Sequence, residues 1–174
     1  MNKKKLKVLG VVIAFVLCFP LHFLYDLMPN FITSIFLPVN ESIAEHMKIL
    51  FGSIMISSVI QKIIVIKKDL NIKNICISNF TGAVLSIPIF LLIFVPIYKA
   101  IGENMPITIF IMFITIVISQ IISYIIINSK NLGLENVTIF LVIIVYIIFG
   151  LLTYFPPEND LFMDPTNLTY GIKK

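Results

Sequence analysis

The sequence predicts an all-α integral membrane protein, a bundle of five transmembrane helices with the N-terminus inside and the C-terminus outside. Of its 174 residues, 59% are hydrophobic and 13% are charged, whereas about a quarter of the residues of a soluble domain are charged. The apolar residues form blocks that match the length of about 20 residues needed to cross a bilayer. Lysines gather in alternate connections between these blocks, which indicates the orientation.

Each expected span is bounded by polar or helix-breaking residues. The first block follows a lysine-rich start and shows no small-x-small cleavage site, so we expect a retained helix rather than a signal peptide. Asn40 is a suitable N-cap for the second helix. A single membrane domain, residues 1–174, is therefore expected to contain spans at about 6–27, 41–66, 75–98, 107–127 and 137–155, followed by a polar outward tail at 156–174.

The distribution of lysine indicates how the chain sits in the membrane. With the N-terminus inside, nine of the thirteen lysines lie on the cytoplasmic side and four lie outside, in agreement with the positive-inside rule. The bias towards Lys, Ile and Asn is typical of AT-rich bacterial genomes, so we expect a multi-pass protein of a bacterial cytoplasmic membrane. The absence of arginine and of a basic stripe argues against nucleic acid as a partner. The lipid bilayer is the expected partner, and a small-molecule or protein partner is left open.

The densest group of polar residues lies at the start of the second span, in the stretch Pro38–Lys48. At 100° per residue, Ser42 and His46 lie on one stripe of this helix. Polar side chains that face lipid are costly, so this flank should face protein or a water-filled cavity. An adjoining stripe carries the charged residues of the stretch, Glu41, Glu45 and Lys48.

Two histidines are expected to meet at the outer end of the first two spans. His22 and Asp26 lie four residues apart and so share a helix face, and a short connection should bring them close to His46. Imidazole and carboxylate groups are ligands of zinc and similar divalent metals, so a metal such as zinc is the cofactor that these residues suggest. The candidate metal ligands are His22, Asp26, Glu45 and His46, the candidate catalytic base is Glu41, and the further candidate site residues are Asn40, Ser42, Lys48, Asp164 and Tyr170.

Three interpretations of this polar cluster are left open, and with them whether the protein is an enzyme. The cluster can be a structural ion-pair and capping group, or bind a small ligand, without catalysis. It can also be the centre of an intramembrane metal-dependent hydrolase. A small transporter or channel subunit is the third interpretation, with polar stripes such as Thr115, Ser119 and Ser123 lining a path. This third interpretation is weakened because spans three to five carry no acidic or basic residue at mid-depth.

The segment Pro38–Ser42, followed by Glu45-His46 and Lys48, resembles the P-V-N-E-S-x-W-E-H-x-K motif of an uncharacterised family of small multi-pass membrane proteins from low-GC Gram-positive bacteria. His22-Phe23 and the tail pattern Phe162-x-Asp164-Pro165…Tyr170-Gly171-Ile172 extend the resemblance over the whole chain. Ala44 stands where the family has tryptophan, an aromatic interfacial anchor. The resemblance implies a membrane location and draws attention to these residues, but it carries no assigned activity. A second, fainter similarity, to transmembrane metal hydrolases of the ceramidase and progestin-receptor type, is confined to the polar helix start, and the third histidine of those proteins is missing.

Overall fold

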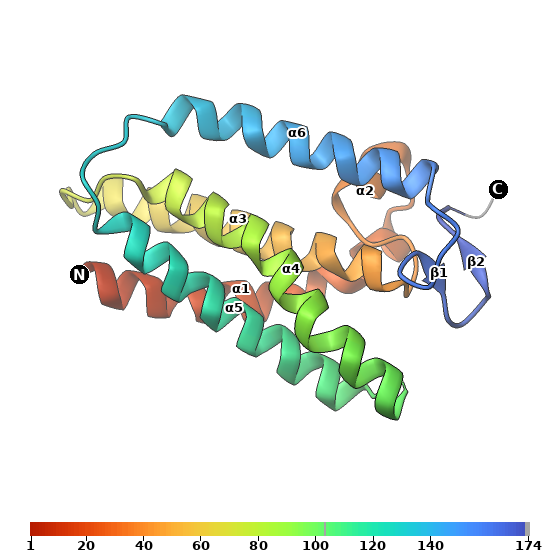
Figure 1. Cartoon of the computed structure of the whole chain (residues 1–174). Helices are drawn as coiled ribbons and strands as arrows, with labels where there is room; N and C mark the ends of the chain where they lie inside the picture. Colours follow the sequence, from red (N-terminus) through yellow and green to blue (C-terminus); the bar gives the residue numbers. More distant parts are fainter. Residues whose placement is uncertain (103, 173–174) are drawn as a thin grey trace.

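The computed structural model describes residues 1–102 and 104–172, and in this part of the chain five helices are long and apolar enough to cross a membrane. These helices are α1 (Lys3–Leu27), α3 (Ile43–Lys67), α4 (Ile75–Ile101), α5 (Met105–Ile127) and α6 (Glu135–Tyr154). They run along a common direction, so that the two chain termini lie at opposite ends of the bundle (Figure 1). The expected helical architecture is confirmed, with five helices that could cross a membrane.

We call the end of the bundle that carries residues 1–3 the N-terminal end, and the end that carries residues 156–172 the tail end. The connection between α1 and α3 lies at the tail end and contains a short helix, α2 (Phe31–Phe36). This helix begins with a capping box, because the Asn30 side chain accepts from the Thr33 N–H while the Thr33 hydroxyl accepts from the Asn30 N–H. The tail carries two short antiparallel strands, β1 (Met163–Asp164) and β2 (Thr169–Tyr170).

Helix α3 is the central helix of the bundle. In the apolar 18-residue segment of α3, 56% of the residues are buried inside the protein, whereas the corresponding segments of α1 and α6 are 17% and 22% buried. Phe51, which is fully buried, packs edge-to-face against Phe80 of α4 and against Tyr146 and Phe149 of α6. Because α3 has neighbours on several sides, its polar residues can be covered by different helices.

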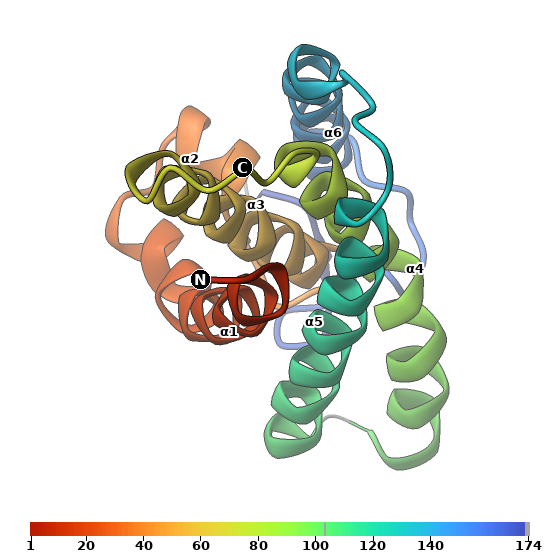
Figure 2. The same ribbon diagram turned by 90° about the vertical axis from the view of Figure 1, so that its left-hand side faces the viewer.

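Helices α4 and α5 pack closely to each other but diverge from α1 and α3 towards the tail end (Figures 1 and 2). Their close contact depends on Gly82, where an added Cβ would lie 2.7 Å from the backbone oxygen of Ser119. Pro88 and Pro96 lie inside α4, and each removes one backbone hydrogen-bond donor from the helix. The divergence leaves space between the two helix pairs at the tail end.

The start of α3 differs from the sequence-based expectation. Ser42, rather than Asn40, is the N-cap, because its hydroxyl accepts from the Glu45 N–H at 3.3 Å. Asn40 instead accepts from the Ser42 N–H at 2.9 Å, and its amide donates to the carbonyl of Gly171 at 3.0 Å. The Ala44 N–H, one of the donors that a helix start leaves unpaired, is satisfied by the Leu161 carbonyl at 2.8 Å. The tail is therefore fastened to the start of α3.

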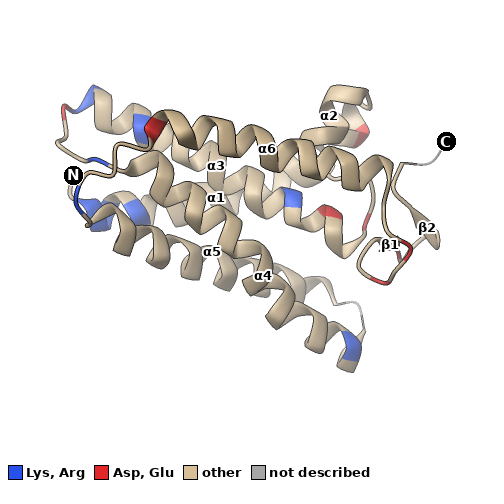
Figure 3. Cartoon of the chain, turned by 45° about the horizontal axis from the view of Figure 1, so that its top comes forward, with Lys and Arg blue, Asp and Glu red and all other residues tan. Residues whose placement is uncertain are grey.

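Charged residues occupy the two ends of the bundle unequally. Lysines gather at the N-terminal end, whereas acidic residues are found mainly at the tail end (Figure 3). The arrangement agrees with the lysine distribution on which the predicted orientation rests. The orientation itself stays a prediction.

Candidate functional site

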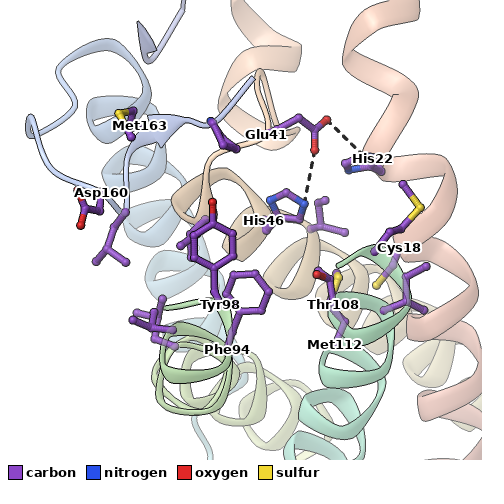
Figure 4. A pocket seen from close by; sticks show the side chains of 18 of the residues that line it. Cys18, His22, Glu41, His46, Phe94, Tyr98, Thr108, Met112, Asp160 and Met163 are labelled. Carbon is purple, nitrogen blue, oxygen red and sulfur yellow. Dashed lines mark ion pairs between the residues drawn. The ribbon is translucent and has the colours of Figure 1, made fainter. Parts of the chain in front are cut away.

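Three side chains of types that can bind a metal converge at the tail end among the described residues. The Nε2 atom of His22, on α1, lies 3.4 Å from Oε1 of Glu41, and Nε2 of His46, on α3, lies 3.8 Å from Oε2 of the same carboxylate (Figure 4). The two imidazole centroids are 5.5 Å apart, as close as the short connection between the first two spans predicts. One ligand atom from each residue lies within 4.8 Å of the other two. We call these residues the His–Glu–His group.

The spacing within the His–Glu–His group suits ligands of one ion better than direct hydrogen bonds. Charge-assisted N–H···O bonds are about 2.7–2.9 Å long, and both histidine–glutamate contacts are longer. Two atoms bound at about 2.0–2.1 Å to a tetrahedral zinc are separated by about 3.3 Å. The contact between His22 and Glu41 already has this separation, whereas the three ligand atoms as a set lie within 4.8 Å of one another and would have to move closer together to share one ion.

A backbone hydrogen bond sets the tautomer of His46. Its Nδ1 lies 2.9 Å from the carbonyl oxygen of Ser42, one turn earlier in the chain. A carbonyl oxygen only accepts hydrogen bonds, so Nδ1 carries a proton, and in the neutral ring Nε2 is then the nitrogen with a free lone pair, directed towards Glu41. Metal-binding histidines commonly hold their second nitrogen in this way, which orients the ring for coordination.

Glu45, expected as a metal ligand, belongs to a different polar group. Its carboxylate lies 2.7 Å from Nζ of Lys48 and accepts from the Val39 N–H at 3.0 Å and from the Thr153 hydroxyl at 2.9 Å. Successive residues of a helix point about 100° apart, so Glu45 is directed towards α2 and α6 while His46 is directed towards α1. With these three partners, Glu45 lies outside the His–Glu–His group, in which Glu41 supplies the carboxylate, and Lys48 is the ion-pair partner of Glu45.

The remaining candidates lie around the centre without joining it. Asp26 is exposed on α1 and outside the His–Glu–His group. Asp164 is 3% exposed, and its carboxylate accepts from the N–H and hydroxyl of Thr166 and from the amide of Asn167, so it stabilises the turn between β1 and β2. Tyr170 is paired with Met163 in the two-stranded ladder. These residues and Asn40 shape the tail, whereas Ser42 orients His46 through its carbonyl.

A cavity of about 1280 Å³ opens beside the His–Glu–His group, and all three members line it (Figure 4). Pockets for small ligands usually measure about 300–1,000 Å³. Its walls come from α1, α3, α4, α5 and the tail, and include Cys18, Phe94, Tyr98, Thr108, Met112 and Asp160. The polar stripe Thr115, Ser119 and Ser123, considered for a transport path, is fully buried between helices and does not line this cavity.

The contribution of α4 and α5 to this cavity has no counterpart in the sequence-based site. Phe94 and Met112 are apolar residues in apolar helices, so their sequence context does not distinguish them from residues that face lipid. The one signal was indirect: prolines 88 and 96 indicate an irregular helix. The cavity depends on the divergence of two helix pairs, which the periodicity of a single helix does not report.

Fold and site together define a small multi-pass membrane protein with a group of potential metal ligands at one end of its bundle. The comparison with family models assigns the chain more narrowly. Residues 1–172 match the model described as "Family of unknown function (DUF6512)", and the chain belongs to this family. No curated protein and no solved structure matches the chain significantly. The family match supports the resemblance to an uncharacterised family, but it assigns no activity or ligand.

Proposed function

We propose that the protein binds a divalent metal, zinc or a metal of similar ligand preference, through His22, Glu41 and His46, and that this centre catalyses hydrolysis. In this proposal the tail end faces the outside of a bacterial cytoplasmic membrane, as the lysine distribution supports. The observation that carries the proposal is the convergence of three ligand atoms within 4.8 Å at the wall of a cavity.

The composition of the group favours a catalytic centre over a structural one. Structural zinc sites are closed by four protein ligands, whereas hydrolytic sites use three, often two histidines and a glutamate, and keep a fourth position for water. The three residues here are of these types, and all of them face the cavity. A fourth position would therefore be reached from the cavity.

Hydrolysis at such a centre would require few further functional groups from the chain. A zinc ion held by these three residues would lower the pKa of a bound water to near neutrality, as zinc does in hydrolases, and would so supply the activation of water. In the reaction one water is consumed: its oxygen bonds to the electrophilic atom of the substrate, the bond to the leaving group breaks, and the leaving group departs with a proton. Glu41, expected as the base, acts as a ligand in this arrangement.

The experiment is a metal analysis of the purified full-length protein after loading with Zn²⁺ or Co²⁺ and removal of excess metal. We expect about one equivalent per chain for the wild type, because three protein ligands define one tetrahedral site. His46→Ala and Glu41→Gln each remove a ligand. The affinity of each variant for the metal should fall by more than 10–100-fold, which is the typical effect of losing an outer-shell partner alone.

Two variants with matched charge changes serve as controls. Asp26→Asn removes a carboxylate one helical turn from His22, and Glu158→Gln removes one that lines the cavity; both lie outside the His–Glu–His group, so both variants should retain the metal. Equal metal content in the wild type and in His46→Ala would overturn the proposal, as would a wild-type protein that binds neither metal.

A further inference from the structure

We propose that the cavity takes the hydrocarbon chain of a membrane amphiphile, that the head group of this molecule binds at the His–Glu–His group, and that the molecule enters sideways from the bilayer. This inference rests on the proposed function for the position of the head group, and it names the substrate class of that centre. Three features of the cavity support it: its open rim, its gradient of polarity and its size.

The rim of the cavity is open on the apolar side of the bundle. Phe23, Leu92 and Met105 line the cavity and yet are 59%, 76% and 69% exposed. They come from α1, α4 and α5, the helices that diverge towards the tail end. In a membrane-spanning helix, large apolar side chains with such exposure are suited to contact with hydrocarbon. Between these helices a lipid chain can therefore enter past apolar side chains, while the exposed Lys99, which α4 also contributes to the lining, lies two residues before that helix ends.

The polarity of the walls changes with depth. On α1, His22 lies one turn nearer the tail end than Cys18 and about two turns nearer than Phe15. Leu91, on α4, and Met112, on α5, line the deeper part, whereas the acidic residues of the lining belong to the tail and to the loop before α3. A membrane amphiphile has the same polarity gradient, with its head at the interface and its chain in the hydrocarbon region.

The apolar depth also separates an amphiphile from a small water-soluble substrate. A polar molecule at the His–Glu–His group would leave most of the roughly 1280 Å³ without a matching ligand surface. For a lipid chain the transfer from bilayer to cavity is close to neutral, because lipid tails are as apolar as the cavity wall. Selectivity should then come from the head group at the metal, while the cavity sets which chains fit.

The test compares two hydroxamates that share a metal-binding head group and differ in chain length. Acetohydroxamate has no chain, and decanohydroxamate has a long one. Both are titrated into the Co²⁺-loaded full-length protein in one detergent, with the visible spectrum of Co²⁺ as the readout. Thr108→Trp places a large side chain in the cavity, on α5 rather than on the segments that carry the three ligands. We expect this variant to bind decanohydroxamate about tenfold or more weakly than the wild type, and acetohydroxamate within about twofold.

The matched control is Phe110→Trp, which introduces the same residue type on α5 at a position that is 63% exposed and outside the cavity lining. This variant should bind both hydroxamates as the wild type does. Partition of decanohydroxamate into the detergent affects every protein equally, because all are measured in the same micelles. Leu91→Trp provides a second cavity-filling variant if Thr108→Trp does not fold.

The outcomes distinguish the two proposals. If both cavity-filling variants bind acetohydroxamate and decanohydroxamate as the wild type does, the amphiphile inference is overturned and the metal centre is left intact. A wild-type protein that shows no Co²⁺ spectrum overturns the proposed function, and with it the position assigned to the head group. Selective loss of decanohydroxamate binding in the cavity-filling variants supports both.

Discussion

Replacement of Lys48 by methionine should destabilise the protein by about 3–5 kcal/mol, the usual cost of leaving one partner of a buried ion pair without the other. The Lys48 and Glu45 side chains are 1% and 6% exposed, and their charged atoms are 2.7 Å apart. Lys48 also donates to the carbonyl oxygens of Ser34 and Leu37 and to the hydroxyl of Thr153. The ammonium group thus connects α2, α3 and α6, and methionine fills the space without replacing any of these bonds.

The double variant Lys48→Met/Glu45→Gln tests the cause of this loss. Replacement of a whole buried ion pair by uncharged groups is often nearly neutral, so the double variant should recover most of the stability lost in Lys48→Met. At about 2–4 °C per kcal/mol for a chain of this size, the single variant should lower the Tm by roughly 6–20 °C. The assay is size-exclusion chromatography of heated samples in detergent.

Two results would contradict this account. A loss below about 1 kcal/mol in Lys48→Met would mean that the ion pair is not a buried anchor. An equal loss in the single and double variants would assign the effect to the lost backbone bonds rather than to the unpaired carboxylate. Metal content is a useful second readout, because Lys48→Met should retain the His–Glu–His group, whose members make none of these contacts.

Two further predictions concern the tail and the orientation. Gly171→Ala should cost more stability than Gly133→Ala: both residues have positive φ, 60° and 66°, and share the strain of about 1–2 kcal/mol, but only the Cβ at 171 would collide with the Thr153 carbonyl. Thermal unfolding measures the difference in stability between the two variants, and limited proteolysis should cut residues 156–172 faster in Gly171→Ala. Equal behaviour of the two variants would show that the tail is not held at this contact. A reporter that is active only in the cytoplasm should stay silent when fused after the last residue, because the lysine distribution places the tail outside; an active fusion would reverse the orientation or change the number of spans.

The helices and the meeting of the two histidines could be predicted from simple physical rules. Blocks of about 20 apolar residues have few stable alternatives to a membrane helix. The connection between α1 and α3 is short, so the ends of these helices must be neighbours, and the cost of exposing imidazole to lipid turns His22 and His46 inwards. Proximity of this kind follows from chain connectivity and does not require knowledge of the remaining helices.

The partner of each carboxylate could not be predicted in this way. Helical periodicity gives the angle between Glu45 and His46 but not which neighbours surround α3. A central helix has protein on several sides, so two adjacent polar residues can belong to separate groups. Glu41 precedes the helix, where no periodic rule applies, and the backbone of the loop decides that its carboxylate reaches both histidines.

Lys7 shows the same limit at the N-terminal end. The sequence places it among the cytoplasmic lysines because it closes a lysine-rich start. In the structure it is 4% exposed, and its Nζ donates to Oδ1 of Asn79 at 2.9 Å and to Oγ of Ser123 at 2.6 Å. These acceptors lie on α4 and α5, more than 70 residues away in sequence, so no local pattern distinguishes Lys7 from its exposed neighbours.

The position of the His–Glu–His group in the chain has a consequence for the order of biosynthesis. All three side chains come from residues 22 to 46, so every proposed metal ligand has been made when the second span begins to emerge. The cavity needs α4, α5 and the tail, and the bond between Thr153 and Glu45 forms only after the last span is in place. During synthesis the histidine and glutamate ligands therefore exist before the walls that limit access to them, and the last-made segments decide what can reach the centre.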